Sequence, residues 1–65
     1  MAPKYDVTAY ALDGNAFSIM AAVTTALRKE GVGDEEVETY LSESISGDYD
    51  NLVATAMRWV RLEKD

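Results

Sequence analysis

Three short glycine-containing breaks limit this chain to short helices and strands. They are "LDGN" (residues 12–15), "GVG" (31–33) and "SGDYD" (46–50). Glycine tolerates backbone conformations that other residues avoid, and aspartate and asparagine are favoured helix N-caps. We therefore expect Asp13 or Asn15 to cap a helix. We expect Gly31 to end that helix in a left-handed conformation, and Asp48 to cap a later one.

The segment before the first break, Lys4–Leu12, has the alternation of a β-strand. Its two faces would carry Tyr5, Val7, Ala9 and Ala11 on one side, and Asp6, Thr8, Tyr10 and Leu12 on the other. Neither face is strongly polar. The strand is therefore expected to be covered on both faces or paired with another chain.

The middle of the chain predicts two helices of different character. Residues 16–30 carry an apolar stripe at spacings of three and four, which Phe17, Ala21 and Ala22 widen until the polar strip is narrow. Such a helix is expected at the centre of the fold, with its methionine in the core. The second helix, residues 34–46, is amphipathic. Its predicted inward stripe consists of Val37, Tyr40, Leu41 and Ile45.

After Asp48 the apolar pattern is again helical, through Leu52, Val53, Ala56, Met57 and Val60. Trp59–Glu63 fits either a continuing helix or a strand. A strand is favoured, because the first strand otherwise has no partner and an unpaired edge is a liability. The predicted fold is α+β: one small domain (residues 1–65), strand–helix–helix–helix–strand, with a two-stranded sheet packed on helices. Strand order and direction stay open.

A chain of 65 residues without cysteine or histidine has few routes to catalysis or metal binding. Disulfides and zinc sites of the thiolate or imidazole kind are excluded, and no histidine is present to activate a serine. Asp48 and Asp50 match two ligand positions of an EF-hand loop, but Leu52 stands where the next ligand belongs. We therefore expect no enzyme activity, no metal site and no cofactor.

The whole chain has a formal net charge of −6, and its acidic residues are concentrated in one part of the sequence. Between Lys29 and Arg58 there is no basic residue, and the acidic ones are Glu30, Asp34, Glu35, Glu36, Glu38, Glu43, Asp48 and Asp50. Such a block repels phosphate backbones, so direct nucleic-acid binding is not expected. It forms either a solvated face or a docking surface for a basic partner.

No segment predicts contact with a membrane. The longest weakly polar run, residues 16–27, is about half of the roughly 20 residues that a membrane span needs. The first ten residues also lack the apolar stretch of a signal peptide. A soluble, cytoplasmic protein is expected.

Two groups of residues are candidates for binding a protein partner. The first is the acidic helix, with Glu35, Glu36, Glu38 and Glu43. The second is an aromatic and cationic group made of Tyr49, Arg58, Trp59 and Arg61. Tyrosine, tryptophan and arginine are enriched at interfaces. An equal alternative is a buried Trp59 flanked by surface arginines.

The stretches "DGNAFSIM", "ALRKEGV" and "SGDYDNLVATAMRWV" resemble a family of small uncharacterised proteins from bacteria, their phages and other mobile elements. The resemblance runs from "KYDV" to "WVRLE", and its most specific parts are "DGNAF" (13–17) and "SGDYD" (46–50). It implies a short cytoplasmic protein of mobile-element origin, with no activity or cofactor to carry over. It also implies an alternating apolar segment at the C-terminus, which supports the second strand.

These observations favour a non-catalytic protein–protein interaction module. In a phage or another mobile element, such a module would be an accessory or host-modulating protein. Three alternatives stay open: an acidic mimic of nucleic acid that inhibits a nucleic-acid-binding enzyme, a cation-binding domain that uses Asp48 and Asp50, and a structural or assembly component. A lone two-stranded sheet is marginal, so self-association that extends the sheet is a further alternative.

Overall fold

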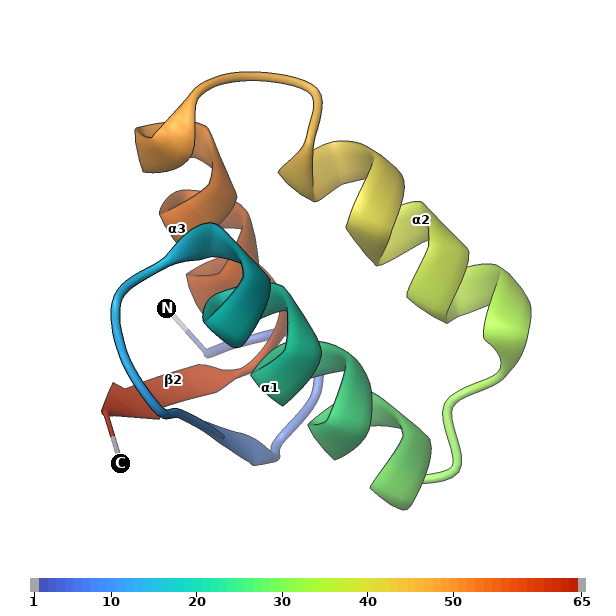
Figure 1. Ribbon diagram of the computed structural model, residues 1–65. Helices are drawn as coiled ribbons and strands as arrows, with labels where there is room; N and C mark the ends of the chain where they lie inside the picture. Colours follow the sequence, from blue (N-terminus) through green and yellow to red (C-terminus); the bar gives the residue numbers. More distant parts are fainter. Residues whose placement is uncertain (1, 65) are drawn as a thin grey trace.

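The computed structural model describes residues 2–64, and within them the elements follow the predicted order (Figure 1). They are β1 (Thr8–Ala11), α1 (Ala16–Lys29), α2 (Asp34–Ser44), α3 (Tyr49–Trp59) and β2 (Arg61–Lys64). β1 and β2 form a two-stranded sheet that packs on α1 and α3. The predicted α+β architecture is therefore confirmed.

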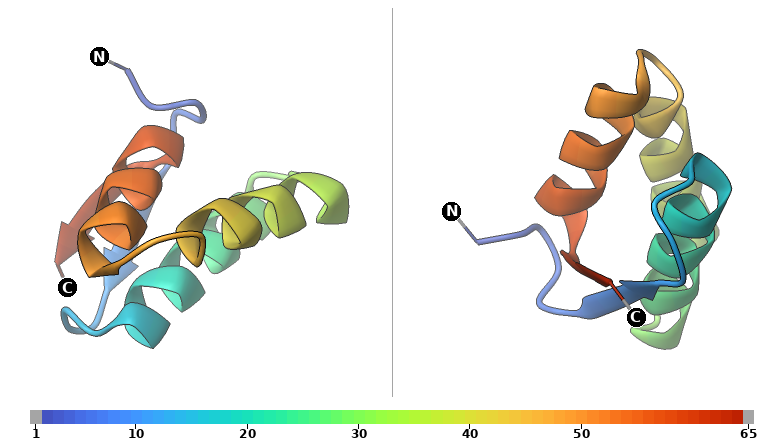
Figure 2. Two further views of the ribbon diagram at one scale, coloured as in Figure 1. Left: turned by 90° about the horizontal axis from the view of Figure 1, so that it is seen from above. Right: turned by 60° about the vertical axis from the view of Figure 1, so that its left-hand side comes forward.

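The two strands lie side by side in parallel, although they are far apart in the sequence. Thr8 pairs with Arg61 and Tyr10 with Glu63, and the Arg61 N–H donates to the Val7 carbonyl at 2.9 Å. Parallel neighbours need a crossover connection. All three helices lie in that connection, and Figure 2 (right view) shows α3 above the strands and α1 running beside them.

Local interactions at the glycine-containing breaks set the helix limits. The Asn15 side chain accepts a hydrogen bond from the Ser18 N–H at 3.0 Å, so Asn15 is the N-cap of α1. Asp48 caps α3 in the same way, through the Asn51 N–H at 2.9 Å. Gly31 has a φ of 85°, as expected for the left-handed residue that ends α1.

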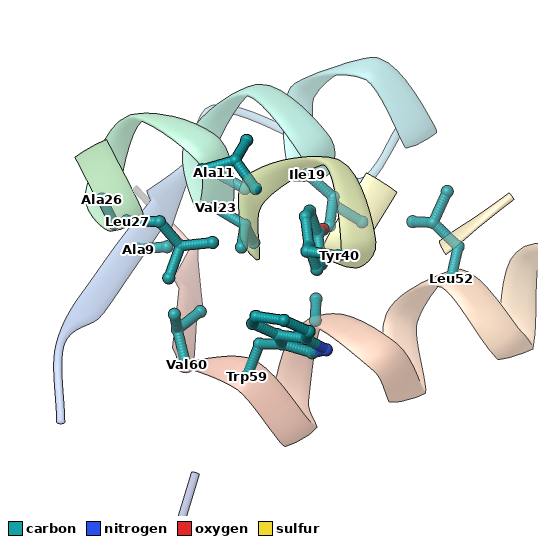
Figure 3. Packing of buried hydrophobic residues seen from close by; sticks show 12 residues of the cluster. Ala9, Ala11, Ile19, Val23, Ala26, Leu27, Tyr40, Leu52, Trp59 and Val60 are labelled. Atoms are coloured by element: carbon teal, nitrogen blue, oxygen red, sulfur yellow. The ribbon is translucent and has the colours of Figure 1, made fainter. Parts of the chain in front are cut away.

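The core lies between the sheet and the three helices, with α1 at its centre (Figure 3). Val23 and Leu27 of α1 are fully buried, and Ile19 is nearly so. The other buried apolar residues are Ala9, Ala11, Ala26, Val37, Tyr40, Leu52, Ala56, Trp59 and Val60. Every element except β2 contributes fully buried apolar residues to this cluster.

The structure corrects the predicted element boundaries. The first strand covers only Thr8–Ala11 of the predicted Lys4–Leu12, because the backbone of Lys4 and Tyr5 bonds instead to the last turn of α3. The second strand begins at Arg61, since Trp59 is the last residue of α3. The second helix ends at Ser44, two residues before the predicted end.

Several predicted core residues are exposed. Ile45 is 68% exposed because it lies beyond the end of α2, and Met57 of α3 is 62% exposed. Phe17 of α1 is 82% exposed, although the helix does lie at the centre of the fold. Tyr10 and Leu12 are exposed too, so β1 is not covered on both faces. Five short elements have too little surface to cover every apolar face.

Among residues 2–64, no helix combines the length and the apolar character that crossing a membrane requires.

Candidate functional site

The "DGNAF" and "SGDYD" segments contact each other. The Tyr49 hydroxyl donates a hydrogen bond to the Gly14 carbonyl and so joins the start of α3 to the loop before α1. In that loop the Asp13 carboxylate accepts from the Asn15 N–H at 2.9 Å. That bond lowers the pKa of Asp13 below its ordinary value. The "DGN" and "GDY" segments therefore form one structural junction.

The "SGDYDN" segment also joins α2 to α3. The Asn51 side-chain amide donates to the Glu43 carbonyl at 2.9 Å and so pairs a backbone group at the end of α2. A Cβ on Gly47 would lie 2.9 Å from the Asn51 Cβ, closer than real side chains allow. Asp48 and Asp50 occupy a cap and a first turn, as predicted. The hydrogen bonds of this segment are helix-end contacts, the α2–α3 contact of Asn51 and the Tyr49 contact with the loop before α1.

Trp59 was a candidate contact residue, with burial as an equal alternative, and only 3% of it is exposed. Its ring stacks on Tyr5 with centroids 5.9 Å apart and meets the edge of Tyr40 at 5.7 Å. Its indole N–H donates to the Glu43 carboxylate at 2.9 Å. Trp59 is therefore a core residue, and the alternative of a buried tryptophan describes it correctly.

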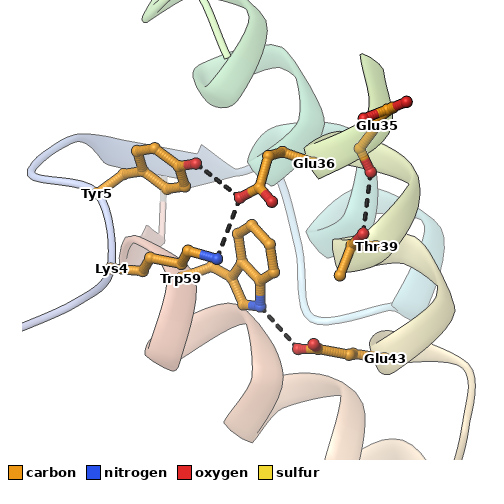
Figure 4. Close-up of polar contacts among 7 residues, drawn as sticks. All are labelled: Lys4, Tyr5, Glu35, Glu36, Thr39, Glu43 and Trp59. Atoms are coloured by element: carbon orange, nitrogen blue, oxygen red, sulfur yellow. Dashed lines mark hydrogen bonds and ion pairs between the residues drawn. The ribbon is translucent and has the colours of Figure 1, made fainter. Parts of the chain in front are cut away.

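A polar cluster covers Trp59 on its outer side (Figure 4). The Tyr5 hydroxyl donates to the Glu36 carboxylate at 2.8 Å, and the Lys4 ammonium lies 3.0 Å from the same carboxylate. The Lys4 nitrogen also sits 4.3 Å from the centroid of the Trp59 ring, within cation–π range. This cluster fixes the segment before β1 against α2 and α3.

The predicted acidic face is thus divided between two roles. Glu36 and Glu43 bind Lys4, Tyr5 and Trp59 within the molecule, so they do not simply face water as predicted. Glu35 and Glu38 are exposed. They border a shallow hollow on α2 whose other lining residues are Thr39, Ser42 and Glu43.

The predicted arginines do not form one cluster with Trp59. Arg58 is exposed and donates to the Thr55 hydroxyl at 3.1 Å, one turn back on α3. Arg61 forms an ion pair with Asp6 beside the start of the sheet. Both arginines contact groups of their own chain. Neither forms an ion pair with an exposed carboxylate of α2 in the described residues.

Sequence reasoning missed an exposed apolar surface beside β1 and α1. Tyr10, Leu12 and Phe17 are 62%, 75% and 82% exposed, and they line one shallow groove between β1 and α1. The other lining residues are Ser18, Ala21, Ala22 and Thr25. We call this set of seven residues the β1–α1 face. Its signal is present in the sequence, in a strand without a polar face and a helix with a narrow polar strip.

Within the described part of the chain, metal-binding side chains do not gather in one place. The sequence has no histidine or cysteine, so acidic side chains are the metal ligands to consider. Residues 2–64 contain no cluster of three or more of them that could hold a metal ion. The buried hydroxyls of Tyr40 and Ser44 lie one turn apart on α2 without a hydrogen-bond partner in this region. Burial raises the pKa of the Tyr40 hydroxyl, which keeps it neutral.

Acid is expected to weaken the polar cluster around Glu36. The Tyr5 hydroxyl first, and then Lys4, hold the pKa of Glu36 below its ordinary value of 4.5. The carboxylate therefore contributes stability that is present above pH 4.5 and is lost as the pH falls through the lower, folded-state pKa. The melting temperature, followed by circular dichroism, should decrease as the pH is lowered through this range.

Glu36→Gln is the control for this effect. Its melting temperature at neutral pH should be lower than that of the wild type, and its further fall in acid should be smaller. An unchanged acid profile in Glu36→Gln would show that other carboxylates cause the acid sensitivity.

No protein-family model, curated protein or solved structure matches this chain.

Proposed function

We propose that this protein is a non-catalytic protein–protein interaction module that binds through the β1–α1 face. The observation that carries the proposal is the side-by-side exposure of Tyr10, Leu12 and Phe17. Contiguous exposed apolar patches often mark interaction sites.

The charge distribution supports the same face. The chain has a formal net charge of −6, yet none of the seven residues of the β1–α1 face is charged. Depletion of charge with enrichment of aromatic residues is typical of the centre of a protein interface. The expected partner surface is accordingly apolar and uncharged.

The resemblance to small proteins of phages and mobile elements supports an accessory or host-modulating role in that setting. A structural role in an assembly would use the same apolar face.

A second candidate function rests on α2. Glu35 and Glu38 are exposed on α2, and their carboxylates, unlike those of Glu36 and Glu43, take part in no ion pair or hydrogen bond seen in the described residues; the Thr39 hydroxyl donates to the backbone carbonyl of Glu35. They could dock on a basic protein surface or imitate a nucleic-acid backbone toward an enzyme that binds one. Either contact would weaken with added salt.

The test is a pull-down with tagged protein from a bacterial lysate that also contains an untagged copy of this chain. The wild type is compared with Phe17→Asp, with the double variant Glu35→Lys/Glu38→Lys, and with Ile45→Asp as the control. Ile45 is a matched control because it is apolar, 68% exposed and outside the β1–α1 face. Each pull-down is run at low and at high salt.

We expect a protein that the wild type and Ile45→Asp capture at both salt concentrations and that Phe17→Asp loses. A partner lost only by the double glutamate variant and at high salt would support the second candidate instead, and competition by DNA or RNA would identify mimicry. Equal capture by the wild type and Phe17→Asp would refute binding through the β1–α1 face.

A further inference from the structure

The free edge of β1 runs along the β1–α1 face. No strand within residues 2–64 pairs with the edge of β1 that points away from β2. Because Val7 directs its carbonyl to β2, the alternation of a strand directs the backbone groups of Thr8 and Tyr10 to the free edge. This edge therefore offers unpaired N–H and C=O groups next to an exposed apolar groove.

The two outer edges of the sheet differ in how they are protected. β2 has the sequence RLEK, with exposed charged side chains at Arg61, Glu63 and Lys64. Charged residues on an edge strand oppose pairing with another chain. β1 has the sequence TAYA and carries neither a charge nor a proline. Only the β2 edge is protected against pairing.

The same face suits a twofold contact with itself. A twofold axis normal to the sheet beside β1 would pair β1 with its copy in the antiparallel direction and place the two α1 helices side by side. The residues that α1 presents there beyond Phe17 are small: Ser18, Ala21, Ala22 and Thr25. Small side chains allow two helices to approach closely, and no like charges of the face would be brought together.

We propose that the occupant of the β1–α1 face is a second copy of this chain, with β1 pairing antiparallel to β1 of the copy to form a four-stranded sheet. The inference rests on the proposed function, because it names the partner of that same face. Pairing would bury Tyr10, Leu12 and Phe17 of both copies. It would also turn a marginal two-stranded sheet into one of independently stable size.

Analytical ultracentrifugation of the wild type tests the dimer. We expect a dimer at high micromolar concentration that dissociates on dilution. Phe17→Asp and Tyr10→Lys should be monomers with the circular dichroism spectrum of a folded protein, since both positions are largely exposed. Met57→Lys, at an equally exposed apolar position outside the face, should remain dimeric. A monomeric wild type up to millimolar concentration would overturn the proposal.

Amide hydrogen exchange, followed residue by residue by NMR, tests the edge pairing itself. The backbone N–H groups of Thr8 and Tyr10 should exchange slowly in concentrated wild-type protein and rapidly on dilution or in Phe17→Asp. A dimer in which both N–H groups exchange rapidly would refute pairing through β1, even if the mass were correct.

Salt separates this proposal from binding through α2. Two copies that each carry a net charge of −6 repel one another, so added salt should tighten the dimer. A dimer that dissociates in salt would overturn the proposal. If the wild type is monomeric but captures a different protein that Phe17→Asp does not capture, the interaction function stands and only the identity of the partner is wrong.

Discussion

Replacing Trp59 by alanine is expected to unfold this domain. Trp59 is 3% exposed and contacts the rings of Tyr5 and Tyr40 as well as the Glu43 carboxylate. Truncating a buried tryptophan costs about 3–5 kcal/mol. The net stability of a domain this small is itself roughly 3–5 kcal/mol. Circular dichroism and urea titration of Trp59→Ala should therefore show no cooperative unfolding transition at room temperature.

Trp59→Phe is the matched variant for the hydrogen bond. It keeps an aromatic ring between Tyr5 and Tyr40 but removes the indole N–H that donates to Glu43. A net loss of about 1–2 kcal/mol is expected, so the variant should fold and melt at a lower temperature. If Trp59→Ala unfolds cooperatively with near wild-type stability, then Trp59 does not hold the core together.

The second large effect is expected at Leu27. This residue of α1 is fully buried among the core residues of the other elements. Leu27→Ala removes buried apolar surface and leaves a cavity, at a cost of about 2–5 kcal/mol. The urea midpoint should fall sharply, or the folded state should be lost.

Leu12→Ala is the control for Leu27→Ala, because the same atoms are removed from a side chain that is 75% exposed. In dilute solution, where the protein is a monomer, the free energy of unfolding of Leu12→Ala should stay within about 0.5 kcal/mol of the wild type. A similar loss in both variants would contradict the assignment of Leu27 to the core and Leu12 to the surface.

The parts of this fold that sequence reasoning predicted are those with local causes. Asn15, Gly31 and Asp48 act through neighbours a few residues away, so residue type and spacing were enough to place the helix ends. The order of elements followed from these limits. The amphipathic pattern of α2 likewise identified Val37 and Tyr40 as core residues.

The parts that were missed depend on contacts between distant segments. Nothing in the pattern around Trp59 shows that Tyr5 will stack on it or that Lys4 will lie over its ring. Periodicity places the apolar Phe17 at the border of the apolar stripe of its helix, but it does not show whether another element covers that side chain. The roles of Glu36 and Glu43 could not be predicted for the same reason, because their partners lie on other elements.

The parallel pairing of β1 with β2 has a consequence for how the domain forms in the cell. Thr8 pairs with Arg61, so the sheet closes only after a chain segment containing all three helices has been synthesised. Contacts between such distant residues are slow to form, since a long loop must be closed first. While the ribosome is still making α3, β1 has no strand of its own chain to pair with on either edge. The nascent domain should therefore gain resistance to proteolysis in one late step, when Arg61–Lys64 leave the ribosomal exit tunnel.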